Sequence, residues 1–257
     1  YTLSLHDAHP ISMKQMLLLD EKILADLNYC SEGSVTLSRL DNLISHGKEA
    51  LNQILPWESI QPEKKRRYDA ALLFLIYPLN VTTDEQSENI LSDVIENLQG
   101  EYGIARYKND SFWCRDYQDL PESIRTSIAK ERQEWMEAHG RELQEGEEAQ
   151  WCLFDPIISA IYGRKYLKTK NHLFLEKQVY YLNRSLGQLT SEDFHLGGFK
   201  CPELYYLQHG EYIPDDATPL LWTQANLLTA LKHMKESLTR KHWINLEAAP
   251  ENGEQSA

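Results

Sequence analysis

The sequence predicts an all-α protein. Apolar residues recur at helical spacing along most of the chain, and residues typical of helix ends flank the clearest of these segments. No stretch alternates strictly as a half-buried strand over more than a few residues. With 257 residues and 42% hydrophobic content, the chain can bury a sizeable core, either as one large domain or as two small ones.

The first part of the chain carries weaker helical patterns. Residues 1–12 show no helical period and no signal-peptide layout, so we expect them to form a non-native or disordered leader. Patterned sequence begins at Met13, and three helices are expected before residue 80, over 16–29, 37–55 and 64–77.

The clearest helix is expected after Thr83. Gln86 follows at the spacing of a capping box, and acidic residues occupy the first turn, where the helix dipole favours negative charge. Gly100 is expected to end this helix in the usual C-terminal place. Its apolar stripe consists of Ile90, Leu91, Val94, Ile95 and Leu98.

Two long loops interrupt the later helices. Both are rich in aromatic and polar groups together, and long loops in a compact helical domain are usually functional. The loops cover residues 100–117 and 197–222, and the helices between them are expected over 122–139, 151–166 and 171–186.

A last helix is expected after the second loop. Thr218 is predicted to be its N-cap, and Pro219 suits its first turn. Its broad buried face should consist of Leu220, Leu221, Leu227, Leu228 and Leu231. The polar, acidic residues 247–257 should be a disordered tail, which leaves a folded domain over 13–246.

The charge balance excludes two classes of partner. The chain has 39 acidic and 26 basic side chains, for a formal net charge of −13. Such an acidic surface repels phosphate backbones and anionic lipids, so we expect neither nucleic acid nor a membrane surface as a partner. No apolar run is long enough for a membrane-spanning helix; the longest, over 70–77, is far too short.

The four cysteines are predicted to be free thiols. Cys30, Cys114, Cys152 and Cys201 lie far apart and form no C-x-x-C pair, which excludes a zinc ribbon or a thioredoxin-type site. Scattered cysteines without a secretion signal indicate a reducing compartment, so the expected location is cytoplasmic.

The residue types in the two long loops suit a carbohydrate site. Sugar rings pack their C–H faces on aromatic rings, and their hydroxyls need polar partners. The first loop offers Arg106, Tyr107, Asp110 and Trp113, and the second offers Glu203, Tyr205 and Trp222. Glu203 follows Pro202 in a Gly- and aromatic-rich segment, which makes it a candidate catalytic carboxylate. The alternative is that the aromatic residues pack a helical core and that Glu203 simply faces solvent.

Three stretches resemble glycoside hydrolase family 15. They are closest to the glucoamylase-like domain of phosphorylase kinase alpha and beta subunits and of their bacterial relatives. The stretches are LNVTTDEQSENILSDVIENLQGEYGIARYKND (79–110), EEAQWCLFDPIISAIYG (147–163) and CPELYYLQHGEYIPDDATPLLWTQANLLTAL (201–231). Together they cover roughly a third of the chain, and the third stretch is the most specific.

The resemblance implies a toroidal (α/α)6 barrel, of which this chain would be a C-terminal part. It also implies an enzyme that inverts the anomeric carbon and needs neither a metal nor an organic cofactor. The family's catalytic base matches Glu203, and the acid is implied beside Trp151. Here Gln150 precedes Trp151 and Cys152 follows it, so Glu148, or Glu147, would have to serve as a displaced acid. The implied substrate contacts are Arg106, Tyr107, Asp110, Trp113, Trp151, Tyr205 and Trp222.

Two functions therefore remain open. The first is a glucoamylase-like hydrolase that cleaves an α-glucan or malto-oligosaccharide from its non-reducing end with inversion. The alternative is a non-catalytic α-glucan-binding or regulatory module related to the phosphorylase kinase subunits. The discriminating feature is a second carboxyl group across the pocket from Glu203. The oligomeric state is left open.

Overall fold

The computed structural model describes residues 37–61, 66–126 and 128–247. The predicted leader, the helix expected over 16–29, Cys30 and residues 248–257 of the expected tail lie outside the described residues. The chain folds into two compact units. Unit 1 runs to Trp151 and includes Tyr206–Ile213; unit 2 comprises Cys152–Tyr205 and the chain from Pro214 onward.

Unit 1 combines helices with short strands. The expected helix over 37–55 is confirmed by α4, whereas the described part of the segment expected over 64–77 is helical only from residue 70 to 76. The pattern over 122–139 likewise gives a short 3₁₀ turn and then α7. The helical elements are α4 (Leu37–Ile54), η2 (Ala70–Leu72), α5 (Leu73–Ile76), α6 (Asp84–Leu98), η3 (Tyr117–Asp119), η4 (Glu122–Ile124) and α7 (Ala129–Ala138).

Helix α6 confirms the capping prediction. The Gln86 N–H donates to Thr83 Oγ1 at 3.1 Å, and the Thr83 N–H donates to Gln86 Oε1 at 2.9 Å. Two orphan backbone donors are thus satisfied at the N-terminus. The buried stripe is the expected one, except that Ile95 is only partly buried: Ile90, Leu91, Val94 and Leu98.

Gly100 has a different role from the one expected. Helix α6 ends at Leu98, and Gly100 does not adopt the left-handed conformation of a C-terminal glycine. A Cβ at this position would collide with the side chain of Gln150. Glycine is therefore required here for close packing, not for its positive φ.

The structure also contains a small sheet, which corrects the all-α prediction. Strands β1 (Ile104–Ala105), β2 (Gln150–Trp151), β3 (Leu204–Gln208) and β4 (Glu211–Pro214) follow one another in that order across it. β1 and β2 are antiparallel, with Ile104 opposite Trp151. Mostly helical content is confirmed; a purely helical fold is not.

The hairpin of β3 and β4 escaped the sequence analysis for a physical reason. The first three residues of β3 are all buried, so polar and apolar residues do not alternate along it. His209 and Gly210 connect the strands, both with positive φ (50° and 89°). A two-residue connection of this kind matches the twist of a hairpin, so the His-Gly pair was the available signal.

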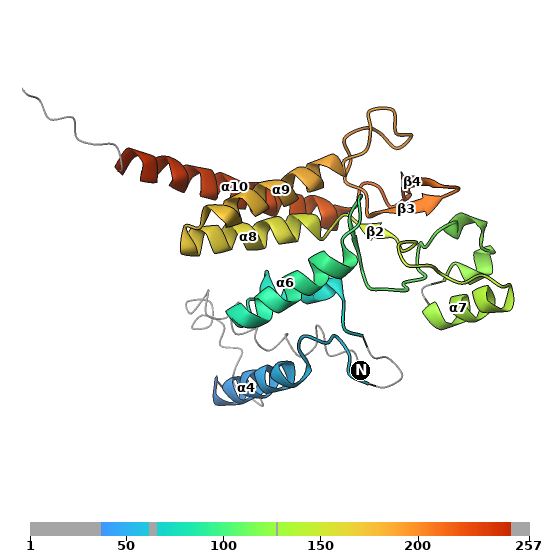
Figure 1. Cartoon of the computed structure of the whole chain (residues 1–257), viewed down its shortest axis with the longest axis horizontal. Coiled ribbons are helices and arrows are strands. Elements are labelled where there is room, and N and C mark those ends of the chain that lie inside the picture. Colours follow the sequence, from blue (N-terminus) through green and yellow to red (C-terminus); the bar gives the residue numbers. More distant parts are fainter. Residues whose placement is uncertain (1–36, 62–65, 127, 248–257) are drawn as a thin grey trace, which may run out of the picture. The chain divides into compact units, whose positions relative to one another are not determined.

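Unit 2 contains three helices, which lie side by side in Figure 1. They are α8 (Asp155–Thr169), α9 (His172–Gly187) and α10 (Leu221–Glu247). Helix α8 is buried along most of its length and packs against both others. The Asn171 side chain accepts the Leu173 N–H at 3.0 Å and begins α9, which confirms the helix expected there. The core of this unit includes Tyr166, Leu175, Leu182, Ala230 and Met234.

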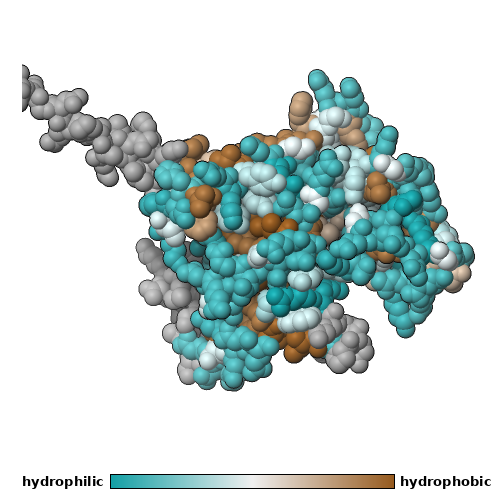
Figure 2. All heavy atoms as spheres, in the orientation of Figure 1, coloured by the Kyte–Doolittle hydropathy of each residue, from teal (hydrophilic) through white to brown (hydrophobic). Residues whose placement is uncertain are grey.

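The predicted leucine face of α10 is wrong for most of its members: Leu220 and Leu227 are partly buried, and Leu227 packs against the core, but the others are exposed. Leu221 is 78% exposed, and Leu228 and Leu231 are also exposed; Figure 2 shows apolar residues at the surface in the region of α9 and α10. The buried face instead carries mostly small or polar side chains: Thr223, Asn226, Ala230, Met234 and Ser237. The bulky aliphatic and aromatic side chains of α8 fill the interface, so α10 contributes small side chains there.

The start of α10 also differs from the prediction. The helix begins at Leu221, and Thr218 does not cap it; its Oγ1 donates to the Asp215 carbonyl at 2.8 Å. Three cysteines, Cys114, Cys152 and Cys201, are confirmed as free thiols, and all are buried. Within the described residues, no helix combines the length and apolarity needed to cross a membrane.

The capping box of α6 gives a first prediction. Thr83→Ala should lower the free energy of unfolding by about 1 kcal/mol, because the Gln86 N–H loses its acceptor. Thr83→Ser keeps the hydroxyl and should stay close to the original protein. Urea unfolding followed by circular dichroism measures both. Equal free energies of unfolding for the Ala and Ser variants would show that the capping box does not stabilise the protein.

Candidate functional site

The residues predicted to form a site are divided between the two units. The prediction that loops 100–117 and 197–222 face a common cleft spans both units and stays a prediction. In unit 1 lie Arg106, Tyr107, Asp110, Trp113, Glu148 and Trp151, and in unit 2 lie Glu203, Tyr205 and Trp222.

Arg106 and Asp110 form a partly buried, bidentate ion pair. Arg106 Nε and Nη2 donate to the two Asp110 oxygens at 2.6 and 3.0 Å. Burial lowers the pKa of Arg106, but the ion pair with Asp110 outweighs this and the net pKa is raised, so the guanidinium stays charged. The guanidinium also lies 4.5 Å from the ring centre of Trp151. Three predicted sugar contacts are therefore in contact with one another.

An acidic pair missed by the sequence analysis lies next to Tyr107. Arg66 Nη1 is 2.8 Å from Asp69 and 3.8 Å from Glu58, and its guanidinium lies 3.6 Å above the Tyr107 ring. Burial raises the pKa of both acids, and the charge of Asp69 raises that of Glu58 further. The only signal in the sequence for this group was the spacing of Arg66 three positions before Asp69, and such a spacing is common.

Trp113 stands in a strained position among aromatic rings. Its φ is 54°, a left-handed value that bulky residues rarely adopt. Its ring stacks on Tyr117 and meets the edge of Tyr206, both with centroids 4.9 Å away. The side chain is half-buried, so it contributes to packing and presents part of its ring to solvent.

The side chains of Glu148 and Gln150 form hydrogen bonds with backbone groups and do not project into an open site. The two oxygens of the buried Glu148 accept the N–H groups of Asn109 and Gly146, at 2.7 and 2.8 Å. Gln150 Oε1 accepts the N–H groups of Tyr102 and Gly103, at 2.7 and 3.1 Å. Both side chains thus anchor loops by satisfying backbone donors.

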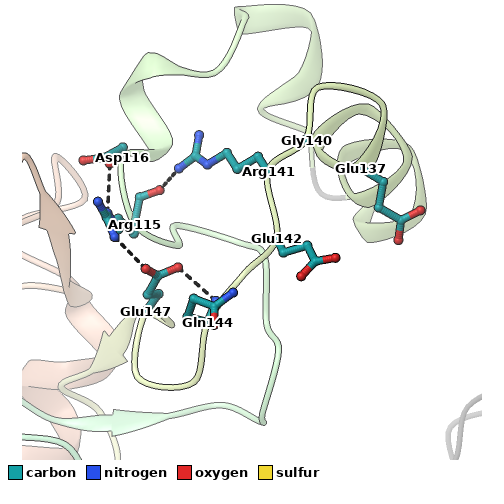
Figure 3. A pocket seen from close by; sticks show the side chains of 8 residues that line it. All are labelled: Arg115, Asp116, Glu137, Gly140, Arg141, Glu142, Gln144 and Glu147. Atoms are coloured by element: carbon teal, nitrogen blue, oxygen red, sulfur yellow. Dashed lines mark hydrogen bonds and ion pairs between the residues drawn. The ribbon is translucent and has the colours of Figure 1, made fainter.

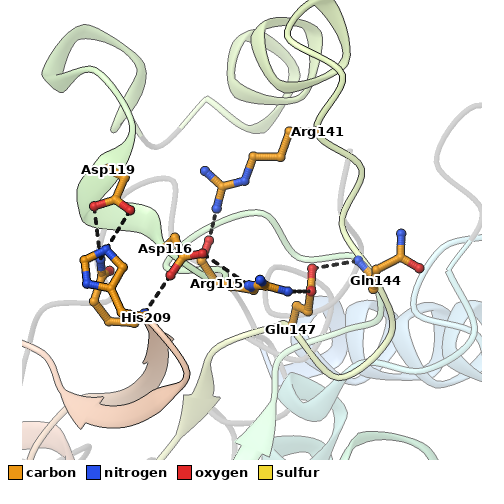
Figure 4. A network of polar contacts seen from close by, with 8 residues as sticks. Arg115, Asp116, Asp119, Arg141, Gln144, Glu147 and His209 are labelled. Carbon is orange, nitrogen blue, oxygen red and sulfur yellow. Dashed lines mark hydrogen bonds and ion pairs between the residues drawn. The ribbon is translucent and has the colours of Figure 1, made fainter.

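A polar hollow of about 560 Å³ opens in unit 1 (Figure 3). Arg115 is one of its lining residues and pairs with Glu147 at 2.7 Å and with Asp116 at 3.1 Å (Figure 4). Arg141 donates to the Arg115 carbonyl. Of the predicted site residues, Glu147, the alternative displaced acid, lines this hollow; the full lining is Arg115, Asp116, Glu137, Gly140, Arg141, Glu142, Gln144 and Glu147.

One group of described residues has the ligand types and spacing for a metal ion. The donor atoms of Asp116, Asp119 and His209 lie within 4.8 Å of one another. The His209 ring forms a hydrogen bond to Asp119 through Nε2 at 2.9 Å, and the backbone N–H of His209 donates to the Asp116 carboxylate at 2.7 Å, as Figure 4 shows. Arg115 already pairs with Asp116, and its positive charge would repel a cation bound there. These contacts tie the β3–β4 turn to η3.

A largely buried ion pair organises unit 2. Asp155, the first residue of α8, is fully buried; Arg184 Nε and Gln188 Nε2 donate to its oxygens at 2.6 and 2.5 Å. Burial raises the pKa of Asp155, and the contacts with Arg184 and Gln188 offset this only in part. The position also places negative charge at a helix N-terminus.

Glu203 is the accessible carboxyl group of the predicted set in unit 2. It is half-buried between two fully buried neighbours, Pro202 and Leu204. Its carbonyl accepts the Cys152 N–H at 2.9 Å, and the N–H of the next residue, Leu204, donates to the buried Asp215 at 3.3 Å. The Cys152 contact therefore holds the Glu203 backbone, while the residue as a whole stays partly exposed.

The two aromatic candidates of unit 2 differ in exposure. Tyr205 is buried, and its hydroxyl donates to the Gln188 carbonyl at 3.1 Å, so it belongs to the core. Trp222 is 52% exposed in the first turn of α10 and can offer a ring face to a ligand. Comparison with known proteins gives no further guide, because neither a protein-family model nor a curated protein matches the chain.

The Asp155–Arg184 pair gives a second prediction. Arg184→Met should lower the free energy of unfolding by about 3–5 kcal/mol at pH 7, because it leaves a charge buried without its partner. The loss should shrink at acidic pH. A raised folded-state pKa means that the folded protein binds the proton more tightly, so stability falls as pH rises.

Chemical denaturation at two pH values measures this effect. The matched control is Arg164→Met, which makes the same change at an exposed position of α8 and should stay within about 0.5 kcal/mol of the original protein. A loss for Arg184→Met that is the same at pH 4 and pH 7 would contradict the assignment of the buried charge to Asp155.

Proposed function

We propose that the chain is part of a glucoamylase-like glycoside hydrolase that acts on α-glucans from the non-reducing end with inversion. In this proposal, α8, α9 and α10 belong to an (α/α)6 toroid and Glu203 is the general base. The observation that supports it best is the environment of Glu203: a half-buried glutamate directly before β3, whose backbone carbonyl is held by the Cys152 N–H.

The proposed step conserves atoms and charge. Glu203 takes a proton from water, the water oxygen bonds to the anomeric carbon from one face, and the glycosidic bond breaks on the other. The departing sugar oxygen takes a proton from a carboxylic acid. Glu148 is the candidate acid, and to act it would have to release one of the two backbone N–H groups that it now holds.

Exposed aromatic and charged groups supply sugar contacts in this proposal. Trp222 can stack on a sugar ring. Tyr107, with two guanidinium groups close to its ring, can bind hydroxyls while Arg66 and Arg106 remain held by carboxylates. Trp151 and Asp110 support this cluster from beneath, since both are buried.

A second function, a non-catalytic α-glucan-binding module, is favoured by one specific observation. Glu148 and Gln150 are the side chains nearest the position implied for the acid. Their carboxylate and amide oxygens accept hydrogen bonds from backbone N–H groups. A segment built this way orders a loop and delivers no proton. Binding would then rest on the aromatic and arginine side chains alone.

Glucose release tests the role of Glu203. Incubation with maltotriose, followed by NMR of the released anomer, should give β-glucose first if the reaction inverts the α-linkage. Glu203→Gln keeps the shape and removes the base, so turnover should fall by about 10²–10⁴-fold with affinity within a few-fold. Glu211→Gln, an exposed glutamate on the same hairpin, should have no effect. Full activity of the Glu203 variant would remove this residue from the mechanism.

Glu148→Gln separates the two functions. An amide has one acceptor oxygen, so the variant leaves one backbone N–H unsatisfied and should lose about 1–3 kcal/mol of stability under either function. A hydrolase that uses Glu148 as its acid should also lose turnover while still binding maltoheptaose by calorimetry. Binding by the original protein without any glucose release would favour the non-catalytic module.

A further inference from the structure

The outer surface of α10 carries a strip of exposed leucines. The strip consists of Leu221, Leu228, Leu231 and Leu238, which are 42–78% exposed. The gaps between them are 7, 3 and 7 residues, which is the spacing of the apolar seam of a coiled coil. Side chains at this spacing share one face of a helix, so the leucines form a continuous apolar surface along α10.

This leucine strip runs beside the seam between α10 and α9. Met234 of α10 belongs to the same core cluster as Leu175 and Leu182 of α9. Leu231 and Leu238 lie three positions before and four positions after Met234, so they adjoin it on the helix surface. Both leucines nevertheless stay exposed, so the strip lies where α10 turns from the core toward solvent.

The exposed apolar surface continues from α10 onto α9. The ring of Tyr181 stacks on that of Tyr162 in α8, with centroids 5.8 Å apart, and the next residue, Leu182, belongs to the core shared with α10. Val179 and Leu186 lie three positions before and four positions after Leu182, and both are exposed. They therefore occupy the flank of α9 next to α10 and away from α8.

The leucine strip is symmetrical along α10, which fits a second copy of the same helix. In a two-fold interface the same patch lies on both sides, so the patch must complement itself. A two-fold axis through the midpoint of the strip brings Leu221 of one copy opposite Leu238 of the other. The same axis brings Leu228 opposite Leu231. Two antiparallel α10 helices therefore bury leucine against leucine in every apolar layer.

The polar residues of the strip favour this same pairing. Gln224 and Lys235 are exposed and continue the seven-residue spacing between the leucines. The antiparallel arrangement places Gln224 opposite Lys235, where the amide oxygen can accept a hydrogen bond from the ammonium group. A parallel arrangement would place Lys235 against its own copy, and the two positive charges would repel each other.

We propose that the leucine strip of α10 is a homodimer interface, in which two copies of the chain pair their α10 helices antiparallel about a two-fold axis. The chain carries a net charge of −13, but no acidic residue stands at the seam positions, so two copies meet the least repulsion along this strip. Val179 and Leu186 widen the interface from α9. This inference goes beyond the proposed function and does not depend on it.

Light scattering of the full chain, coupled to size-exclusion chromatography, is the first test. At micromolar concentration the chain should elute with twice its mass of 29.9 kDa. Leu228→Glu buries an unpaired charge in the central layer, so it should weaken the dimer by at least about 100-fold and give a monomer. Circular dichroism should show an unchanged helical content, because the side chain is exposed within the copy itself.

The matched control is Leu173→Glu. Leu173 is an equally exposed leucine of α9, and it lies nine residues before Leu182, which places it on the opposite side of that helix. This variant should remain a dimer. A monomeric original protein would overturn the inference and assign the strip to a different partner. A dimer that persists in Leu228→Glu would overturn it as well.

Gln224→Glu tests the direction of the pairing and does not challenge the fold. In the antiparallel dimer the new carboxylate faces Lys235 of the second copy twice, so sedimentation equilibrium should show about 3–10-fold tighter association at low salt. The gain should shrink as the salt concentration rises. In a parallel dimer the two glutamates would face each other and association would weaken. Weaker or unchanged association would therefore overturn the antiparallel interface, even if Leu228→Glu failed to fold.

Discussion

Buried backbone N–H groups must find acceptors, and this constraint shapes both units. The long segments between helices and strands satisfy only part of their donors with backbone carbonyls, and buried side-chain oxygens accept several of the others. Gln150 holds Tyr102 and Gly103, and Glu148 holds Asn109 and Gly146. Asp215 does the same for Leu204 and Ala217 in unit 2. Without these acceptors, the loops that carry the candidate residues would have no fixed path.

The same constraint sorts the polar residues of the candidate site. Side chains such as Glu148 are committed to backbone donors, and Arg106 is committed to Asp110. Glu203 differs, because its backbone is fixed by Cys152 while the residue itself is only half-buried. A group held rigidly and left chemically accessible is what general-base catalysis requires. The case for function therefore centres on this one position.

Helix α10 shows how much a burial pattern depends on the neighbouring element. Leu221, Leu228, Leu231 and Leu238 are exposed, and its small residues face the crowded side chains of α8. Ala230 and Met234 pack there with Tyr166, and Asn226 donates to the Leu153 carbonyl at 3.0 Å. A count of apolar residues cannot reveal this choice, because the volume available on the partner helix decides which face fits.

The sequence by itself determined the local elements of this protein. The capping box at Thr83, the Asn171 cap and the helical periods of α4, α6, α8 and α9 depend on residues within a few positions of each other, so they can be read along the chain. Tertiary structure alone decided the rest. The small sheet, the close approach at Gly100 and the hydrogen bond from Leu204 to Asp215 join residues that are distant in sequence or packed on both faces. Such contacts are selected by packing and by the pairing of buried polar groups, and neither leaves a periodic trace in the sequence.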